Sequence, residues 1–410
     1  MELQFRKMRG RVVVLLAALI GCIAQPALAA DLNGHPQVRI TDGLQSTGWR
    51  DFTLHRDGMI LMTGTLNGVP ANILIDSGVS AVIVHSEFAK RAGVDDSVKT
   101  TIHTVVGQTN GSRASGLNLE IAGLELSGRP GFIVDLSPVQ KVAGAEIDVM
   151  LGYDIFEAFM VDIDFPSRKI AFHDPRRFRP PAEAIGVPLR EEKKRPGIRS
   201  VPLMIEGKEV LATFDLGAKP ALLLSPKYAA EHDLLSGKRQ STLMSTGVEG
   251  SSLATVVTLG KVELGGISQA QVPTTIPPTW QNDRRNIPVP ATIGMGLLSR
   301  FRIISDYSSG RLWLVPNAAA LEKPFTKDRS GLRTLLTGNR LKVLHVSQGS
   351  PAAAAGWREG DEIVAVNGSP VGADFYKGDL YRWSDAPAGT RAELRLADGS
   401  TSLLTLEDYY

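Results

Sequence analysis

Two aspartates recur in the same short sequence pattern. Asp76 lies in the sequence ILIDSGV and Asp215 lies in the sequence ATFDLGA, so each follows an apolar run. The glycines two positions later, Gly78 and Gly217, permit a sharp turn after the strand that each apolar run predicts. Two carboxyl groups that such turns bring together cannot both ionise easily, so they share one proton. One then acts as a base toward a water molecule while the protonated one polarises a carbonyl group.

The aspartates belong to a longer internal duplication. Asp76 and Asp215 are 139 positions apart. The other matched landmarks are the Leu-Gly pair at 151–152 with the Ile-Gly pair at 293–294, Asp164 with Asp306, and helix-like segments at 86–93 and 225–231. Ser86 and Ser225 are placed to cap those two helices. The near-constant offset predicts two homologous β-rich lobes.

The first aspartate loop resembles that of the retropepsin-like aspartic proteases, whose active-site sequence is Asp-Thr/Ser-Gly. Residues 76–78 match it, and the Leu-Gly pair at 151–152 resembles the hydrophobic-Gly element that packs beside this loop in the family. The Thr-rich segment 105–111 lies where the family has its flap hairpin. The resemblance implies a mainly β fold, with two homologous acid-protease-type β-barrel lobes. It also implies that the two aspartates form a dyad that hydrolyses polypeptides without a cofactor.

The second aspartate loop departs from the family pattern, because Leu216 stands where the family has Thr or Ser. In the family, that hydroxyl bonds to the opposite loop and braces the dyad. Ser77 can supply such a bond from the first loop, whereas Leu216 cannot. The second flap, expected near residues 245–252, carries no identifying residue. Two interpretations of Asp215 stay open: a catalytic partner, or a turn residue in a lobe that only supports the fold.

The segment 343–368 resembles a bacterial PDZ domain, a small β-barrel with short helices. Its Ser-Pro-Ala-Ala sequence predicts a capped short helix, and its Gly-Asp and Asn-Gly pairs predict turns that flank a strand. PDZ domains bind extended peptides, usually C-termini, at a sheet edge. The resemblance implies that a loop with Gly331, Leu332 and Arg333 holds the peptide carboxylate, and that Arg333 or Arg340 adds charge. The alternative is a structural brace with an empty groove.

The N-terminal residues predict export. Basic residues precede an apolar segment at 12–20 that is too short to span a bilayer. The Ala-x-Ala sequence at 27–29 predicts cleavage before Ala30, whereas Leu-Ile-Gly-Cys at 19–22 resembles a lipoprotein signal with Cys22 acylated. Both routes lead to the periplasm or envelope, the second with a lipid anchor. Cys22 is the only cysteine of the chain, which excludes an intramolecular disulfide and thiol catalysis.

The overall charge gives no reason to expect a nucleic-acid partner, since 45 basic and 43 acidic residues leave a net charge of +2. The seven histidines lack a metal-binding spacing, and the chain has no phosphate-binding loop or dinucleotide fingerprint. We therefore expect neither a metal nor a cofactor. A charged run at 191–195 indicates a solvated turn.

The composition also suggests where the domains begin and end. The expected divisions are a signal peptide at 1–29, a tether or opening strand at 30–54, lobe 1 at 55–178, a linker at 179–200, lobe 2 at 201–318 and a PDZ domain at 325–410. We expect an aspartic-type endopeptidase of the bacterial envelope whose PDZ domain binds peptide or protein C-termini. The alternatives are an inactive peptide-binding protein, which Leu216 favours, and a PDZ scaffold whose lobes are structural.

Overall fold

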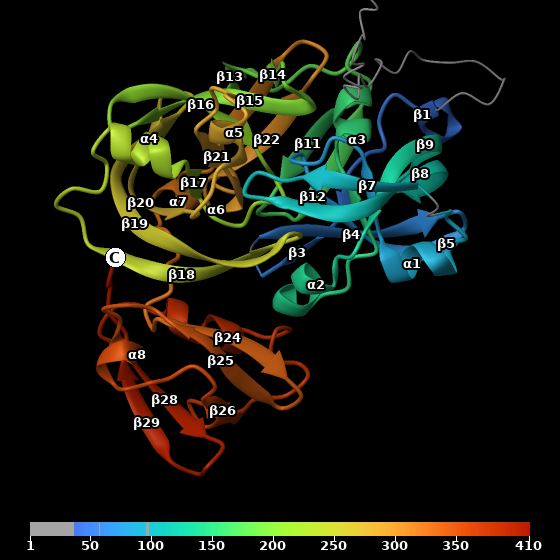
Figure 1. Ribbon diagram of the computed structural model, residues 1–410. Coiled ribbons are helices and arrows are strands. Elements are labelled where there is room, and N and C mark those ends of the chain that lie inside the picture. The colour runs from blue at the N-terminus through green and yellow to red at the C-terminus, as the bar shows by residue number, and fades with distance from the viewer. Residues whose placement is uncertain (1–36, 57, 96–97) are drawn as a thin grey trace, which may run out of the picture.

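The computed structural model describes residues 37–410 except 57, 96 and 97, so the expected signal peptide and Cys22 lie outside the described residues. The described chain is mainly β. It forms two lobes side by side, with a smaller C-terminal domain packed below them (Figure 1). Among the described helices, none is long and apolar enough to cross a membrane.

Lobe 1 is built on a sheet that closes into a ring. Its central strands have nearly continuous apolar runs, because both of their faces are buried. β8 pairs with both β4 and β9, which closes the path. In pairing order the strands are β1 (Gln37–Ile40), β9 (Leu124–Val134), β6 (Val82–His85), β10 (Val149–Leu151), β5 (Val69–Ile75), β4 (Met59–Leu66), β8 (Gln108–Ile121) and β7 (Val98–His103), with β3 (Thr53–His55) beside β4.

Lobe 2 repeats this arrangement, except that β1 has no counterpart in its eight-stranded sheet. Here β15 pairs with β19 and closes the ring. The pairing order is β14 (Arg190–Glu192), β15 (Arg195–Ile205), β16 (Lys208–Phe214), β21 (Ala291–Ile293), β17 (Leu222–Leu224), β20 (Ile267–Ile276), β19 (Gly250–Leu264) and β18 (Gln240–Gly247). β16 and β21 are parallel neighbours, as β5 and β10 are in lobe 1. The duplication predicted from the sequence is therefore confirmed.

A third sheet joins the two lobes. Its strands are, in order, β13 (Ile185–Pro188), β23 (Arg311–Pro316), β22 (Phe301–Asp306), β11 (Met160–Asp164), β12 (Lys169–His173) and β2 (Arg50–Asp51). Lobe 1 supplies β11 and lobe 2 supplies β22, and the two pair antiparallel. Arg302 on β22 also donates hydrogen bonds of 2.9 and 2.7 Å to the buried carboxylate of Asp162 on β11. The lobes are thus held together by backbone pairing and by an ion pair.

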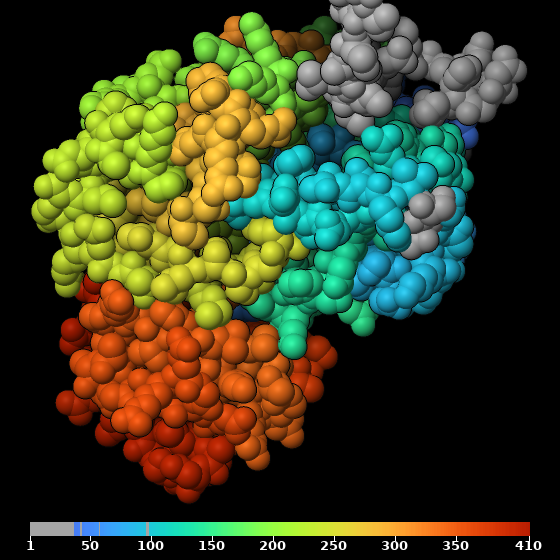
Figure 2. All heavy atoms as spheres, in the orientation of Figure 1, coloured from blue at the N-terminus to red at the C-terminus, as the bar shows by residue number. Residues whose placement is uncertain are grey.

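The C-terminal domain has its own sheet and its own apolar core around Trp357 and Trp383. The strands are β24 (Leu332–Thr337), β25 (Arg340–Val346), β26 (Glu362–Val366), β28 (Arg391–Leu396) and β29 (Thr401–Thr405), with β27 (Ser369–Pro370) beside β26. Its attachment to lobe 2 includes β18, where the Ser241 hydroxyl donates to the Gln348 carbonyl at 2.6 Å. Figure 2 shows this domain packed against the lower side of the lobes.

The helices are short and lie at the ends of strands. They are α1 (Ser86–Arg91), α2 (Ser137–Ala143), α3 (Tyr153–Ala158), α4 (Pro226–Glu231), α5 (Gln281–Arg284), α6 (Met295–Leu298), α7 (Ala318–Leu321) and α8 (Pro351–Ala354), with the 3-10 turns η1 (Thr41–Gly43) and η2 (Leu380–Asp385). Ser225 caps α4 as expected, since its hydroxyl accepts the Tyr228 N–H at 3.1 Å. Ser86 does not cap α1, because it lies within the helix and His85 is the N-cap residue.

The segment expected to be a tether or an opening strand and the segment expected to be a linker both form parts of sheets. The expected tether, 30–54, contains β1, β2 and most of β3 in its described part, and the expected linker, 179–200, contains β13, β14 and the start of β15. Both are polar because several of these strands lie at sheet edges, where one side faces solvent. Edge position, rather than lack of structure, explains their composition.

Candidate active site

Backbone pairing places the two aspartates at equivalent points of the two lobes. β5 ends at Ile75, and the next residue, Asp76, donates its N–H to the carbonyl of Leu151 at 3.0 Å. β16 likewise ends one residue before Asp215, whose N–H donates to the carbonyl of Ile293 at 3.1 Å. Each aspartate is therefore fixed by the strand that the apolar run predicts and by the parallel strand next to it.

The hydrophobic-Gly pairs lie beside the aspartate loops, as the sequence predicts. A Cβ on Gly152 would overlap the Asp76 carbonyl, and a Cβ on Gly294 would overlap the Ala218 carbonyl. Glycine is needed at both positions because only its bare Cα lets the backbone approach so closely. The same close approach in both lobes lets each aspartate loop lie against the end of β10 or β21.

The two aspartate loops meet face to face. A Cβ on Gly217 would overlap the carboxylate of Asp76, and a Cβ on Gly78 would lie 2.7 Å from the carboxylate of Asp215. The two carboxyl groups hydrogen-bond to each other. Each also accepts an N–H from its own loop, at 2.7 Å from Gly78 and 2.9 Å from Gly217. The structure thus brings together Asp76, Asp215, Gly78 and Gly217.

The carboxyl groups of the dyad favour a shared proton. Burial raises the pKa of Asp76 well above its ordinary value, and the charge of Asp215 raises it further. Burial also raises the pKa of Asp215, whereas the N–H groups of Gly217 and Ala218 act to lower it. Because the pair is coupled, the titration belongs to the dyad as a unit. The arrangement suits one protonated and one ionised carboxyl group over a range of acidic pH.

Half of the hydroxyl brace is present. The Ser77 hydroxyl donates to the Phe214 carbonyl at 3.0 Å and accepts the Leu216 N–H at 2.9 Å. Both bonds cross from the first loop to the second. Leu216 has no hydroxyl group that could form the equivalent bonds from the second loop to the first. Its fully buried side chain packs into the apolar core instead. Apolar packing therefore replaces the second half of the brace.

Two hairpins, one from each lobe, line the same cavity as the dyad. In lobe 1, β7 and β8 meet at a turn around residues 104–107, and in lobe 2, β18 and β19 meet at residues 248–249. Both expected flap regions thus form hairpins. The lobe-1 tip reaches lobe 2, since its Val105 carbonyl accepts the Gln281 N–H at 2.8 Å and its Val106 carbonyl accepts the Thr279 hydroxyl at 2.5 Å.

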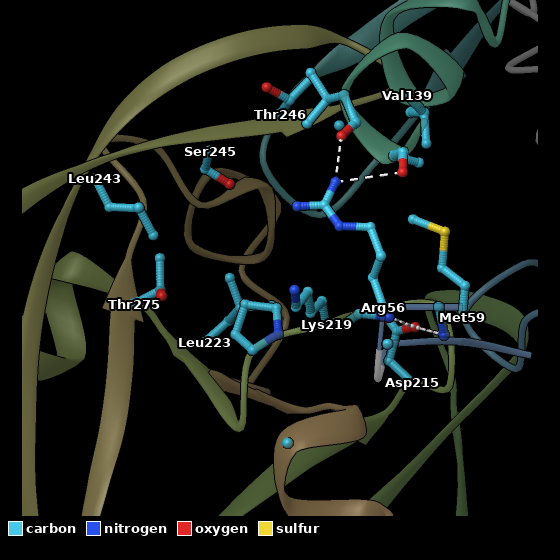
Figure 3. A pocket seen from close by; sticks show the side chains of 18 of the residues that line it. Arg56, Met59, Val139, Asp215, Lys219, Leu223, Leu243, Ser245, Thr246 and Thr275 are labelled. Carbon is cyan, nitrogen blue, oxygen red and sulfur yellow. Dashed lines mark hydrogen bonds between the residues drawn. The ribbon is translucent and has the colours of Figure 1, made fainter. Parts of the chain in front are cut away.

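The hairpins and loops enclose a cavity of about 840 Å³. Asp76 and Asp215 line it, and so do residues from both hairpins. Figure 3 shows Asp215 and Lys219 at one side, and Leu243, Ser245 and Thr246 of β18 at another. A space of this size, with an acid-base pair in its wall, can hold several residues of an extended polypeptide.

A buried ion pair beside Asp215 was missed by the sequence interpretation. The run 191–195 was expected to be a solvated turn, and residues 193–194 do form an exposed turn, but Glu192 is buried and forms an ion pair with Arg195. Arg195 also donates to the Thr213 hydroxyl at 2.7 Å, and its charge acts to lower the pKa of Asp215. The available signal was the position of the run directly before a strand of lobe 2.

In the C-terminal domain, side chains of the same domain accept the backbone N–H groups of the predicted carboxylate-binding loop. The Gly331 N–H donates to Asp328 Oδ2 at 2.8 Å, and the Leu332 N–H donates to Ser330 Oγ at 3.0 Å. These are two of the backbone donors expected to hold a peptide carboxylate, so the loop does not offer them. Arg333 lines the same cavity as the dyad, whereas Arg340 pairs with Glu362.

Comparison with known proteins supports the assignment of the lobes. The aspartyl protease family model matches residues 62–155 and 201–297, one segment in each lobe. A search of curated proteins found no match. The matched segments contain Asp76 and Asp215 with the loops around them. Both lobes are therefore similar to the aspartyl protease family.

Proposed function

We propose that this chain is an aspartic endopeptidase in which Asp76 and Asp215 activate a water molecule against a peptide carbonyl. The ionised carboxyl group takes a proton from water, and the protonated one donates a hydrogen bond to the carbonyl oxygen as negative charge develops there. The proton taken from water then passes to the leaving amine. The observation that carries the proposal is the meeting of two carboxyl groups from different lobes in one cavity, each carboxyl group against the glycine of the opposite loop.

The walls of the cavity support a polypeptide substrate with apolar side chains on both sides of the cleaved bond. Apolar lining residues come from both lobes: Ile83, Ile102, Phe132, Met150, Leu223 and Leu243. Burying an apolar side chain contributes about 25 cal/mol per Å² of surface removed from water. The free energy for placing the scissile bond would therefore come mainly from apolar contacts.

The test of this function is cleavage of an unfolded protein mixture across pH by wild type and by Asp76→Asn and Asp215→Asn. We expect both variants to lose activity, because each leaves a single ionisable carboxyl group at the site. Asp164→Asn, which changes a lobe-1 aspartate outside the cavity, is the matched control and should retain activity. Equal cleavage by wild type and the Asp76 and Asp215 variants would refute the assignment.

Leu216 favours a second candidate, a catalytically inactive protein that binds peptides. Its buried side chain supplies no hydroxyl to the dyad brace. In that case wild type would bind unfolded peptides and leave them intact at every pH. The same cleavage assay, read beside a binding assay, separates the two candidates.

We also propose that the protein is exported and that its C-terminal domain is a peptide-binding domain of the PDZ type. The support for export is the basic and apolar N-terminal sequence with its cleavage sequences. The mass of the mature N-terminus tests it: a start at Ala30, or an acylated Cys22, agrees with export, and a retained Met1 contradicts it. The support for peptide binding is the separate core of the domain and the free edge of its strand β24.

A further inference from the structure

The two aspartate loops give their carboxyl groups different hydrogen bonds. Each aspartate accepts the N–H of the glycine in its own loop, but Asp215 Oδ1 also accepts the Ala218 N–H at 3.0 Å. The corresponding residue of lobe 1 is Val79, whose N–H donates to the backbone carbonyl of Asp76 at 3.3 Å instead. The Gly217 N–H acts on both carboxyl groups and does not distinguish them. Since N–H donors favour the ionised form of a carboxyl group, the second loop stabilises an ionised aspartate more than the first loop does.

A second difference is the guanidinium group of Arg195, at the start of β15. Its Nε donates to Glu192 Oε2 at 2.7 Å, and its Nη2 donates to the Thr213 hydroxyl at 2.7 Å. The Thr213 hydroxyl donates in turn to Glu192 Oε1 at 2.9 Å. These bonds fix the guanidinium in one place. The side chains of Arg195 and Glu192 are 14% and 1% exposed, so water and salt screen the charges poorly.

Thr213 brings this cation to the Asp215 side of the dyad. It precedes Asp215 by two residues at the end of β16, and alternate residues of an extended chain project from the same face. The corresponding residue of lobe 1 is Leu74, which is buried in an apolar cluster with Ile83. The charge of Arg195 acts to lower the pKa of Asp215, whereas the charge of Asp215 raises the pKa of Asp76.

Other charged groups near the dyad do not oppose this asymmetry. Arg199 lies over the ring of Tyr307 and forms ion pairs with Glu157 and Glu191, so its charge is balanced. Burial raises the pKa of Tyr307, which keeps its hydroxyl neutral. In the cavity wall, Lys219 lies on the lobe-2 side, where a positive charge acts in the same direction as Arg195 (Figure 3).

Resting on the proposed peptidase function, we propose that Arg195 is a positioning residue that keeps the shared proton on Asp76, so that Asp215 is the carboxylate that takes a proton from water. As the water O–H bond breaks, its oxygen bonds to the peptide carbonyl carbon, and Asp76 donates its hydrogen bond to the carbonyl oxygen. When the C–N bond breaks, Asp215 passes the proton from water to the nitrogen, and Asp76 keeps its own. Arg195 acts through Thr213 and through its charge, since it does not line the cavity.

An epoxide distinguishes the two carboxyl groups without any peptide hydrolysis. An ionised carboxylate oxygen attacks an epoxide carbon, so an ester C–O bond forms and a C–O bond of the ring breaks. The released oxygen takes the proton of the neighbouring carboxyl group. Full-length protein is treated with glycidyl phenyl ether and digested, and the esters on Asp76 and Asp215 are quantified by mass spectrometry.

We expect the ester on Asp215 to exceed that on Asp76 by about tenfold or more, because the ionised carboxylate is the nucleophile. Equal amounts, or an excess on Asp76, would overturn the proposal. The absence of both esters would also overturn it, since an ionised carboxylate with a proton donor beside it opens epoxides.

Substitutions test the part played by Arg195. The double variant Glu192→Gln, Arg195→Gln removes both charges together, so that neither is left buried alone, and should lower the ratio of the two esters by about threefold or more. Arg195→Lys keeps the charge and should keep most of the ratio. Lys193→Gln changes an exposed residue of the same run and should leave the ratio intact.

An unchanged ratio in a double variant with the wild-type circular dichroism spectrum would overturn the role of Arg195. If the double variant folds poorly, Thr213→Val provides the test, because it removes only the hydroxyl that holds the guanidinium. It should shift the ratio in the same direction, and an unchanged ratio there would likewise overturn that role.

Cleavage of unfolded protein by the wild type is measured in parallel, so the two ideas fail separately. Ester on Asp215 without any cleavage would support the position of the proton and refute the peptidase function. Cleavage with equal esters on the two aspartates would refute the position of the proton alone.

Discussion

Replacing Ser77 by alanine removes the brace beneath the dyad. The hydroxyl is the partner of both the Leu216 N–H and the Phe214 carbonyl, and Ser77 and Leu216 are fully buried. Water cannot take over the two lost bonds at this depth. Leaving one buried backbone group without a partner costs about 1–3 kcal/mol. With two groups, the expected loss in the free energy of unfolding is about 2–6 kcal/mol.

Ser305 offers a matched control. It is also a fully buried serine, but its hydroxyl has no hydrogen-bond partner among the described residues. Ser305→Ala removes the same atom without breaking a bond, so we expect little change in stability. Urea unfolding followed by circular dichroism and by tryptophan fluorescence compares the two variants, and coincident curves would show that the lobes unfold together.

The urea midpoints of the two variants decide whether the cross-loop bonds of Ser77 stabilise the fold. Equal urea midpoints for Ser77→Ala and Ser305→Ala would show that the cross-loop bonds do not stabilise the fold. We also expect Ser77→Ala to lower kcat more than it raises KM, because the hydroxyl positions the dyad and does not touch substrate. A change in KM alone would contradict that role.

Three further predictions concern the loops and the buried charges. Gly217→Ala should abolish cleavage, because the new Cβ overlaps the Asp76 carboxylate. The control Gly378→Ala adds a Cβ in open space and should leave cleavage unchanged. Retained activity in Gly217→Ala would contradict the contact between the two loops. Asp76 has its pKa raised above the ordinary 3.8, so its contribution to stability is present at low pH and is lost as pH rises. The gain in Tm on Asp76→Asn should therefore be small near pH 3.8 and grow toward neutral pH, and a gain independent of pH would contradict the assignment. Asp154→Asn leaves the buried Arg129 without its carboxylate partner and should lower the free energy of unfolding by about 3–5 kcal/mol. Urea titrations measure this loss, and a loss below about 1 kcal/mol would contradict a stabilising role for the ion pair.

The dyad was predictable from the sequence because its determinants are local. An apolar run, an aspartate and a glycine specify a strand and a turn, and the duplication specifies that two such turns exist. The family resemblance then added that the turns face each other. The barrel form of the lobes and the two flap hairpins were expected from the family resemblance, because closing each ring pairs strands that lie far apart in the sequence.

The features that were missed depend on burial and on specific side-chain partners, which composition alone does not show. The run 191–195 has the composition of a solvated turn, yet Glu192 and Arg195 are drawn inward by each other and by Thr213 on the neighbouring strand. Gly331 was expected to offer its N–H to a peptide, but Asp328, three residues earlier, accepts it. The contact of Arg56 with Tyr376 has no sequence signal, because it joins lobe 1 to another domain.

The sheet shared by the two lobes has a consequence for how the protein folds. Val161 of β11 pairs with Ser305 of β22, so lobe 1 cannot complete its outer sheet until most of the chain has been synthesised. Until then β11 presents an apolar, unpaired edge, and such edges recruit other strands. Pairing over this sequence separation is also slow, because the loop-closure entropy must be overcome first. We therefore expect newly made chains to be most prone to aggregation, or to pairing of β11 with a second copy, between the synthesis of lobe 1 and that of β22.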